Sequence, residues 1–497
     1  MTAVRNDYSA TPLPMPDRAC IPAEYRQDVQ DLFDTWHALR GRNSRIDRYM
    51  NMRLHTKNLG ISVPPNMEKS VNAVVGWART AVNAMAVRSR FDGYNVNGHS
   101  LPELDELVHA NAMDELYDVA MREAMAYGVS FVTVMAGSEG QPAAKVRSYS
   151  ANQACGIWDG FADRLACGIT LAGVDRNGRA TRYVLHEPNE TVTFTRDNAT
   201  WTATVETHNT GRPLMEPLVF EREDDRPLGH SRITPEIMGI IDKAMRDVLR
   251  MEVGAEFFTA PQRYILGADD DLFDGDTSKF KAYMGQFLAL TKDEDGDVPQ
   301  VGQFSPGDPR NFVQLFENDA QRFSGATHVP VAQLGVLSST YTSSDALNAT
   351  NDPLILDVKR MNVRMARSME SVGRLILAVS RGERLSEVMA SDDGRQLRAS
   401  MPDPAMLTLG ARVDAWVKIG SMDSRAVGTD FWYEQMGVSK PDRARLEEQL
   451  AEGEKRERLR QLREQMTAPV AKRDAAQPLV AAQMKPNPEQ GADHGSA

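Results

Sequence analysis

The side chains that could do chemistry in this chain form no recognised catalytic pattern. The sequence lacks the phosphate-binding pattern GxxxxGK(S/T), the zinc patterns HExxH and CxxC, and the nucleophile pattern GxSxG. Its nine histidines are scattered, and positions such as His109 and His328 are typical of packing or surface residues. Cys20, Cys155 and Cys167 are too few and too far apart for a disulfide framework or a zinc site. We therefore predict no catalytic residue, no metal site and no cofactor.

One acidic segment partly fits a calcium-binding loop. In DDLFDGDTSKFK, residues 270–281, Asp270, Asp274 and Gly275 occupy the first, fifth and sixth positions of such a loop. The third position is Leu272 and the twelfth is Lys281, where calcium would need oxygen ligands. A solvated acidic loop is therefore favoured over a calcium site.

The elements that would position any functional residue begin with helices and strands in the first half of the chain. Helices are predicted within 23–55 and over 103–127, and GVSFVTVMAG, residues 128–137, is a strand rich in β-branched residues. Two hairpins follow, one around the Asn-Gly pair of DRNG and one around RDNA. We expect residues 128–220 to be mostly antiparallel sheet.

A helix rich in small residues is predicted after Pro64-Pro65, beginning near Asn66. The apolar residues Val71, Val74, Val75, Ala78, Val82, Met85 and Ala86 recur at steps of three and four. Ala and Gly at 73, 76, 78, 81, 84 and 86 leave little bulk. A neighbouring element, from the same chain or another chain, could therefore approach closely.

A long helix is predicted after residue 233. Thr234 can cap it and Pro235 suits its first turn. Its apolar positions repeat at four and three, which predicts a seam for a partner helix; the packing residues are Ile237, Ile241, Val248, Met251 and Phe258. A short excursion with an acidic loop, a second helix, a Ser/Thr-rich loop and another long helix follow. That last helix is predicted to be interrupted by Pro353 and to carry a stripe from Leu354 to Val379.

This order of elements resembles the SPP1-like portal proteins of tailed phages. The motifs that carry the resemblance span about residues 40–450: LGISVPPNMEKSVNAVVGWARTAVNAMAVRSRFDGYNV, AMAYGVSFVTV, GHSRITPEIMGIIDKAM, APQRYILG and RVDAWVKIGSMDSRAVGTDFWYEQMGVS. The sequence departs from the family at RYMNMRLHTKN, where a Tyr-Tyr-Gly-like element is common. The resemblance implies an α+β portal-type fold with an α/β wing containing antiparallel strands, a helical stem, a small α/β clip and a helical C-terminal crown.

The resemblance also implies a division of the chain, completed at both ends by composition. The parts are a flexible arm at 1–24, wing at 25–233, first stem helix at 234–258, clip at 259–313, second stem helix at 314–327, tunnel loop at 328–345, long wing helix at 346–380, crown at 381–465 and disordered tail at 466–497. The residues implied to border the DNA channel are Ser338, Ser339, Thr340, Tyr341, Thr342, Ser343 and Ser344. Those expected to dock partners on the clip are Asp293, Glu294, Asp295 and Asp297.

The function implied by the resemblance is a ring, usually of twelve subunits, at one capsid vertex. DNA would pass through it during packaging and ejection, and the terminase large subunit and a head-tail adaptor would dock on it, beside the major capsid protein. The chain would be made in the host cytoplasm and end in the virion. Its formal charge of −12 disfavours tight adhesion to DNA, and it has neither a signal region nor an apolar run of about 18 residues, so no membrane is expected. The alternatives are a terminase-like packaging enzyme, disfavoured by the missing phosphate loop, and a shell or scaffold protein without DNA passage.

Overall fold

A computed structural model of the 497-residue chain describes residues 13–54, 73–198, 200–259, 263–266, 300–303, 310–336, 349–405, 409–438 and 440–467. The chain divides into two compact units, Met1–Ala405 and Met406–Ala497. Helices and antiparallel strands make up the described parts, which confirms the α+β fold class. No helix in these ranges is both long enough and apolar enough to cross a membrane.

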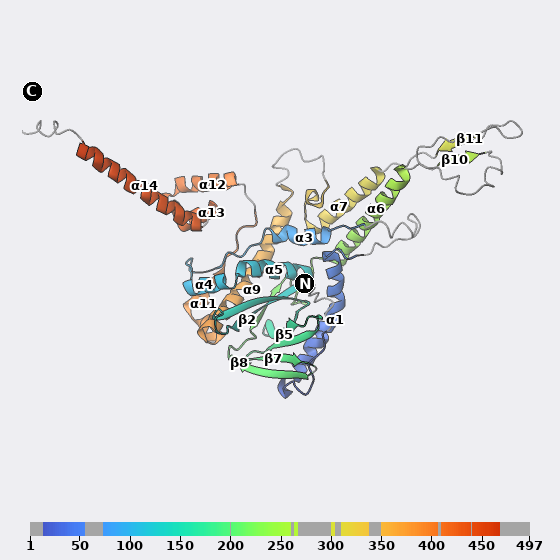
Figure 1. The fold of residues 1–497 in the computed structure, drawn as a ribbon, viewed down its shortest axis with the longest axis horizontal. Coiled ribbons are helices and arrows are strands. Elements are labelled where there is room, and N and C mark those ends of the chain that lie inside the picture. Colours follow the sequence, from blue (N-terminus) through green and yellow to red (C-terminus); the bar gives the residue numbers. More distant parts are fainter. Residues whose placement is uncertain are drawn as a thin grey trace, which may run out of the picture. The chain divides into compact units, whose positions relative to one another are not determined.

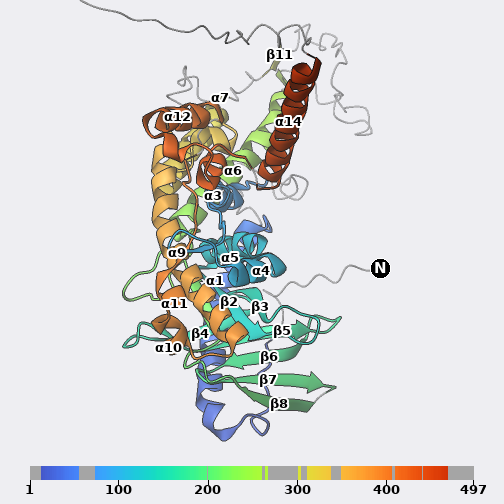
Figure 2. The same ribbon diagram turned by 90° about the vertical axis from the view of Figure 1, so that its left-hand side faces the viewer.

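The strands of the first unit form two larger antiparallel sheets, as the sequence predicted for 128–220 (Figures 1 and 2). One sheet has the order β4-β5-β6-β7-β8 and the other β3-β2-β9. The Asn-Gly hairpin joins β5 to β6, where the Asp175 carboxylate accepts hydrogen bonds from the backbone N–H groups of Asn177 and Arg179, each at 2.8 Å. The bounds are β2 Val129–Ala136, β3 Ala144–Ser150, β4 Ala154–Asp159, β5 Arg164–Val174, β6 Ala180–His186, β7 Glu190–Asp197, β8 Thr200–Thr207 and β9 Met215–Val219.

The helix α1, Arg26–Met50, covers the five-stranded sheet and follows a short 3-10 turn at Ala23–Tyr25. Its buried face carries Phe33 and Trp36, and both rings meet Tyr183 of β6 edge-on. The centroid of Tyr183 lies 5.3 Å from that of Phe33 and 5.4 Å from that of Trp201. These aromatic contacts hold α1 against the sheet. The buried residues between them form a hydrophobic core separate from the main one.

The three-stranded sheet packs against the helices α5, Met113–Tyr127, and α9, Asp352–Arg381 (Figure 2). The predicted stripe of α9 is confirmed from Leu354 to Ile376, all of whose members are buried. Pro353 lies in the first turn of α9, which continues without a break after it, whereas before it residue 349 is helical and residues 350–351 form a turn. Proline is well accommodated there because the first N–H groups of a helix have no partner within it.

Two predicted helices differ from those observed. The small-residue helix α3 spans only Trp77–Ala86, and the described residues 73–76 before it are not helical. Gly76 stands at its N-cap, and the low helix propensity of glycine accounts for the late start. The segment 103–127 forms two helices, α4 at Pro102–Ala110 and α5, because Ala112 adopts a left-handed conformation at φ 45° between them.

Residues 382–405 belong to the first unit, although the predicted crown began at 381. They form α10, Leu385–Ala390, α11, Asp392–Gln396, and β12, Leu397–Ala399, which pairs with β1, Tyr94–Val96. Gly373 of α9 permits the close approach of this small sheet, because an added Cβ there would lie 2.8 Å from side-chain atoms of Tyr94 and Leu397. The predicted start at 381 missed this pairing because β1 and β12 lie some 300 residues apart.

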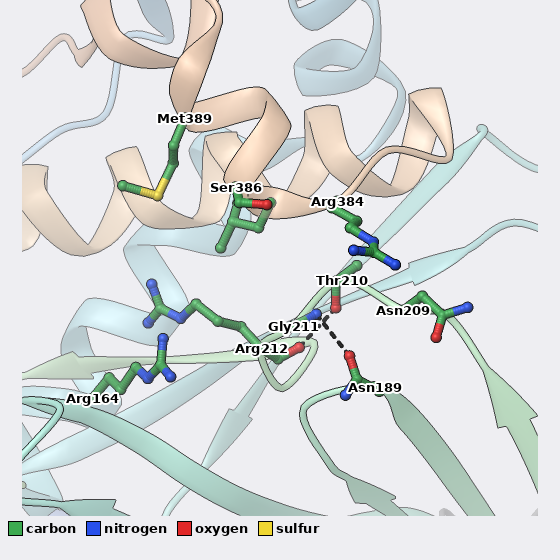
Figure 3. A pocket seen from close by; sticks show the side chains of 10 residues that line it. Arg164, Asn189, Asn209, Thr210, Gly211, Arg212, Arg384, Ser386 and Met389 are labelled. Carbon is green, nitrogen blue, oxygen red and sulfur yellow. Dashed lines mark hydrogen bonds between the residues drawn. The ribbon is translucent and has the colours of Figure 1, made fainter.

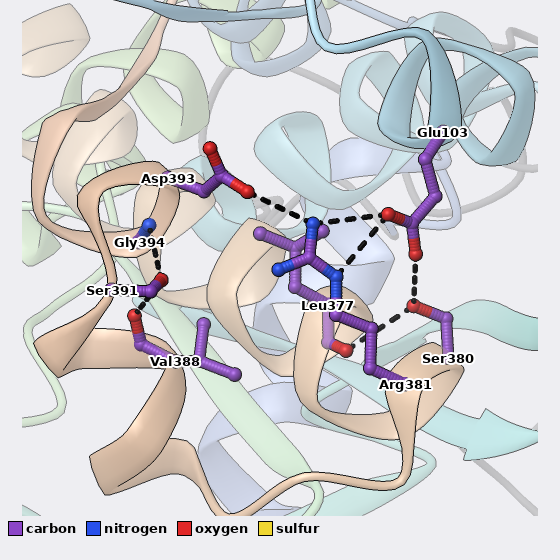
Figure 4. A network of polar contacts seen from close by, with 8 residues as sticks. All are labelled: Glu103, Leu377, Ser380, Arg381, Val388, Ser391, Asp393 and Gly394. Atoms are coloured by element: carbon purple, nitrogen blue, oxygen red, sulfur yellow. Dashed lines mark hydrogen bonds and ion pairs between the residues drawn. The ribbon is translucent and has the colours of Figure 1, made fainter.

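A polar network fixes the end of α9 (Figure 4). The Arg381 guanidinium donates to Glu103 of α4 at 3.0 and 3.2 Å and to Asp393 of α11 at 3.0 Å. The Ser391 hydroxyl accepts a hydrogen bond from the backbone N–H of Gly394 at 3.2 Å and caps α11. One guanidinium therefore ties three helices together.

The second unit is helical where it is described. It contains α12, Leu409–Met422, α13, Asp430–Gln435, and α14, Lys440–Thr467, with a 3-10 turn at Ser424–Ala426. The rings of Trp416 and Phe431 meet edge-on with centroids 5.4 Å apart, which joins α12 to α13. The helix α14 is the predicted charged helix, and Arg443 pairs with Glu447 one turn later.

Two further helices and a strand pair complete the described chain. The helix α6 spans Pro235–Thr259, and α7 spans Arg310–Thr327 and is followed by a 3-10 turn at Val331–Leu334. Between α6 and α7 in sequence, β10, Arg263–Leu266, pairs antiparallel with β11, Gln300–Gln303. Figure 1 shows α6 and α7 side by side, with β10 and β11 beyond their shared end.

Candidate functional site

The paired helices α6 and α7 are the candidate functional element of the described chain. The backbone N–H of Ile237 donates to the Thr234 hydroxyl at 3.3 Å, which confirms the predicted cap, and Pro235 opens α6. The helix α7 begins at Arg310, four residues before the predicted second stem helix. The pair thus forms an extended helical hairpin that carries β10 and β11 at its far end.

The predicted seam of α6 packs inside its own subunit in the first half of the helix. Ile237 and Ile241 are buried in the main core, where Phe323 of α7 is also buried. Trp77 of α3 contacts α7 through Phe316 and Phe323, at centroid distances of 5.1 and 5.3 Å. Further along α6, Val248 and Met251 are half-buried, and the side chain of Phe258 lies outside the described residues.

A charged network joins α6 to α7, and the sequence analysis did not identify it. Lys243 Nζ donates to Asp319 Oδ1 at 2.5 Å and to Asp247 Oδ2 at 3.2 Å, and Arg250 Nη1 donates to Asp247 Oδ1 at 3.1 Å. The side chains of Asp247 and Asp319 are 1% and 0% exposed, whereas those of Lys243 and Arg250 reach the surface. Lys243 and Asp247 stand at i and i+4, but Asp319 is 76 residues away, so its part in the network had no sequence signal.

Burial and the nearby Asp247 carboxylate raise the pKa of Asp319, while the Lys243 ammonium opposes that rise. The pKa of Lys243 is raised by its hydrogen bonds to Asp319 and Asp247, which outweigh its partial burial. Asp319 Oδ2 has no hydrogen-bond partner among the described residues. The ammonium of Lys243 therefore supplies the positive charge that offsets the burial of the Asp319 carboxylate between α6 and α7.

A buried arginine connects α3, α6 and α7 at the base of the hairpin. The guanidinium of Arg232, just before α6, donates to the backbone carbonyls of Ala81 in α3 at 3.0 Å and Thr327 in α7 at 2.5 Å. Burial lowers the pKa of Arg232 below its usual range. The small residues of α3 thus admit a neighbouring element of the same chain at Ala81.

The predicted channel and clip residues lie outside the described residues. These are Ser338, Ser339, Thr340, Tyr341, Thr342, Ser343 and Ser344 of the tunnel loop, and Asp293, Glu294, Asp295 and Asp297 of the clip. The segments that flank the tunnel loop are described. Before it, Gly335 ends a 3-10 turn at φ 82°; after it, Asn351 accepts a hydrogen bond from Arg88 at 3.0 Å.

The titratable groups of the described chain offer no candidate metal centre. In those ranges no group of three or more His, Cys, Asp or Glu side chains is arranged to hold a metal ion. All three cysteines are free, and burial raises the pKa of Cys155 to about 12. Such a thiol stays protonated at neutral pH, so it is a poor nucleophile and a poor metal ligand.

Comparison with known proteins assigns the chain to a family. Residues 31–425 match the family described as "Phage portal protein, SPP1 Gp6-like". The chain is 25% identical over 451 residues to the portal protein of Mycobacterium phage D29, covering 88% of this chain and 90% of the relative. It is 24% identical over 423 residues to the portal protein of Mycobacterium phage L5, covering 82% and 84% of the two chains.

Among solved structures, the chain is similar to one in the virion of the native gene transfer agent (GTA) particle. The identity is 14%, the TM-score is 0.42, and the match covers 73% of this chain and 89% of that chain. A chain in the neck of the native GTA particle, computed with C12 symmetry, matches at 15% identity and a TM-score of 0.42, with the same coverage.

Proposed function

The chain belongs to the SPP1 Gp6-like family of phage portal proteins, and from that membership we propose that it forms a ring of twelve subunits at one capsid vertex. DNA passes through the ring during packaging and ejection. The observation that carries the proposal is the family match over residues 31–425, which includes the helical hairpin and both larger sheets.

The architecture of the described chain supports a conduit that positions other proteins. The helix α6 has 25 residues and is therefore roughly 37 Å long at 1.5 Å per residue, so it presents the segment after it at a distance from the sheets. The terminase large subunit, and later a head-tail adaptor, dock on this segment, the clip, through Asp293, Glu294, Asp295 and Asp297. The wing faces the major capsid protein, and assembly takes place in the host cytoplasm before the ring becomes part of the virion.

The charge of the chain supports passage of DNA without tight binding. Each phosphate that a protein neutralises adds salt-dependent affinity, so DNA that must slide should meet few fixed cations. The formal charge of −12 satisfies this requirement, and the tunnel segment 337–347 contains no Lys or Arg. Its hydroxyls can exchange hydrogen bonds between phosphates and water.

Ring contacts would use apolar residues that remain exposed in the single subunit. On α9, Leu356 and Val363 are 60% and 57% exposed and stand seven residues apart, two helical turns along one face. This face is remote from the buried stripe of α9. A closed ring needs two different surfaces that fit each other head to tail, and this exposed face is one candidate.

The proposal is tested by electron microscopy of the purified full-length chain. Class averages should show closed rings with an axial channel, and their symmetry counts the subunits. Rings without a channel would instead support a shell or scaffold protein. The chain acts as a non-enzymatic conduit in this proposal, so the isolated protein should hydrolyse no ATP; sustained ATP hydrolysis would favour a terminase-like enzyme.

A further inference from the structure

A cavity in the first unit gathers arginine side chains from segments far apart in sequence (Figure 3). It has a volume of about 430 Å³ and lies between the end of the five-stranded sheet and α10. Arg164 comes from β5, Arg212 from the loop after β8, and Arg384 from the residue before α10. No acidic side chain of the described residues lines it.

The floor of the cavity is held in place by the chain itself. Asn189 organises the loop 209–212 by accepting a hydrogen bond on its side chain from the backbone N–H of Gly211 at 3.1 Å. The buried Thr210 hydroxyl donates to the backbone carbonyl of Arg212 at 2.8 Å. The backbone N–H of Leu385 donates to the Thr210 carbonyl at 3.2 Å, which joins the loop to α10. These hydrogen bonds fix the backbone at Arg212 and join it to the start of α10, next to Arg384.

Two of the three guanidiniums form no ion pair among the described residues. Arg212 pairs with Glu216 at 3.2 Å. Asp159 lies opposite Arg164 across β4 and β5, and its carboxylate accepts hydrogen bonds from the backbone N–H groups of residues 161 and 162. Those N–H groups, and to a lesser extent the charge of Arg164, lower the pKa of Asp159, but the two side chains form no ion pair. The Glu387 carboxylate accepts the backbone N–H of Arg384 at 3.1 Å, not its guanidinium.

Within the described chain, then, the Arg164 and Arg384 guanidiniums form no ion pair, and both residues are exposed. A free arginine fork is suited to bind an oxyanion through two parallel N–H donors. Two such forks lining one cavity can bind two anionic groups of the same ligand.

We propose that this cavity is a docking site for an acidic segment of another polypeptide, whose carboxylates pair with Arg164 and Arg384. The lining suits a peptide because it also offers the side-chain amides of Asn189 and Asn209 to a backbone and the apolar side chain of Met389 to a neighbouring residue.

Duplex DNA fits the cavity less well. Backbone recognition of a duplex uses cations spread along an exposed surface, so that several successive phosphates are contacted. Here the cations line one recess between a sheet loop and a helix. The charge of the chain as a whole, −12, also opposes general adhesion to DNA.

The test measures binding of a fluorescein-labelled hexaglutamate peptide to the full-length protein by fluorescence anisotropy at low salt. The double variant R164Q/R384Q should bind at least about tenfold more weakly, because two charge-assisted contacts are lost. The matched control R90Q/R176Q removes the same charge at two exposed arginines outside the cavity, and it should bind like the unmodified protein. The conservative variant R164K/R384K should retain part of the affinity.

Thermal melting of each variant checks that the fold is intact, and R384Q alone provides a milder change at an exposed position. The proposal is overturned if the unmodified protein does not bind the peptide, or if R164Q/R384Q and the control bind it equally. It is also overturned if a 20-base-pair duplex displaces the peptide and itself requires Arg164 and Arg384, since the cavity would then be a nucleic-acid site.

Discussion

Replacing Lys243 by Met should loosen the helix pair α6 and α7. The substitution removes the ammonium that contacts both buried carboxylates and keeps a side chain of similar length. Asp247 retains Arg250, but Asp319 Oδ1 loses its contact with Lys243, and Oδ2 has no partner among the described residues. The perturbation therefore leaves a buried carboxylate without a compensating charge.

The size of the effect follows from burial. Removing one partner of a fully buried ion pair costs about 3–5 kcal/mol. The Lys243 side chain is 35% exposed, so water can replace part of its interaction, and we expect about 2 kcal/mol. Adding Asp319→Asn to Lys243→Met removes the buried charge and should recover most of this loss.

Hydrogen–deuterium exchange of peptides from α6 and α7 measures the effect locally, which suits a long chain that need not unfold in one step. At pH 8, Lys243→Met should exchange about 30-fold faster than the unmodified protein, the ratio that corresponds to about 2 kcal/mol. Exchange in α14, which belongs to the other compact unit, provides the internal control.

The effect should also depend on pH. Without the ammonium, only burial and Asp247 act on Asp319, so its folded-state pKa rises further. A carboxyl whose pKa is higher in the folded chain binds its proton more tightly there, so the penalty is present above that pKa and disappears as the pH falls below it. Equal exchange in Lys243→Met and the unmodified protein at pH 8, or no recovery in the double variant, would refute the assigned role of Lys243.

Four further changes test other parts of the molecule. Ile241→Asp should abolish rings because the subunit itself is destabilised by a buried unpaired carboxylate, and its soluble yield and melting temperature should both fall; normal rings of normal stability would contradict this. Burial and Asp47 raise the pKa of Glu123 to about 7, so the folded chain should lose stability as the pH rises from about 4.5 to 7. Glu123→Gln should remove that loss, seen as a higher melting temperature than the unmodified protein at pH 8 but not at pH 4.5; a similar difference at both values would argue against it. Replacing the four clip carboxylates by Ser should weaken terminase docking, measured by co-sedimentation, and leave rings intact. Replacing both Thr340 and Thr342 by Lys should slow DNA packaging at low salt, with partial relief at higher salt and normal ring assembly. An unchanged packaging rate would show that this loop does not line the channel.

The sequence predicted those elements whose signal is local. The hairpin around DRNG needed only an Asn-Gly pair between apolar strands, and the stripe of α9 needed only periodicity. The start of α3 was placed too early because its apolar spacing continues through Gly76, where the low helix propensity of glycine prevailed. Pro353 marks the start of α9 after a turn at residues 350–351, because proline disrupts a helix interior but fits the first turn.

The packing of the hairpin could not be predicted because it depends on residues far apart in sequence. Arg232 lies 151 residues from Ala81 and 95 residues from Thr327, and no spacing rule connects them. The seam of α6 was recognised as a packing surface, but periodicity alone does not say whether its partner is in the same subunit. For the proposed channel and clip, the sequence supplied residue types and the family resemblance supplied the roles, which remain predictions.

The internal packing of α6 constrains how a ring can form. Ile237 and Ile241 are already buried within the subunit, and the Asp247 carboxylate is paired with Lys243 and Arg250. This side of α6 is therefore already packed and does not require contacts from a neighbouring subunit. A buried charged network also tolerates little sliding, because a shift of one turn would separate Lys243 from Asp319 and leave the buried Asp319 carboxylate unpaired. We therefore expect α6 and α7 to move as one rigid strut, with subunit contacts made by other faces such as that of Leu356 and Val363. Adjustment between subunits would then occur at those faces, while the distance from the sheets to the clip stays fixed.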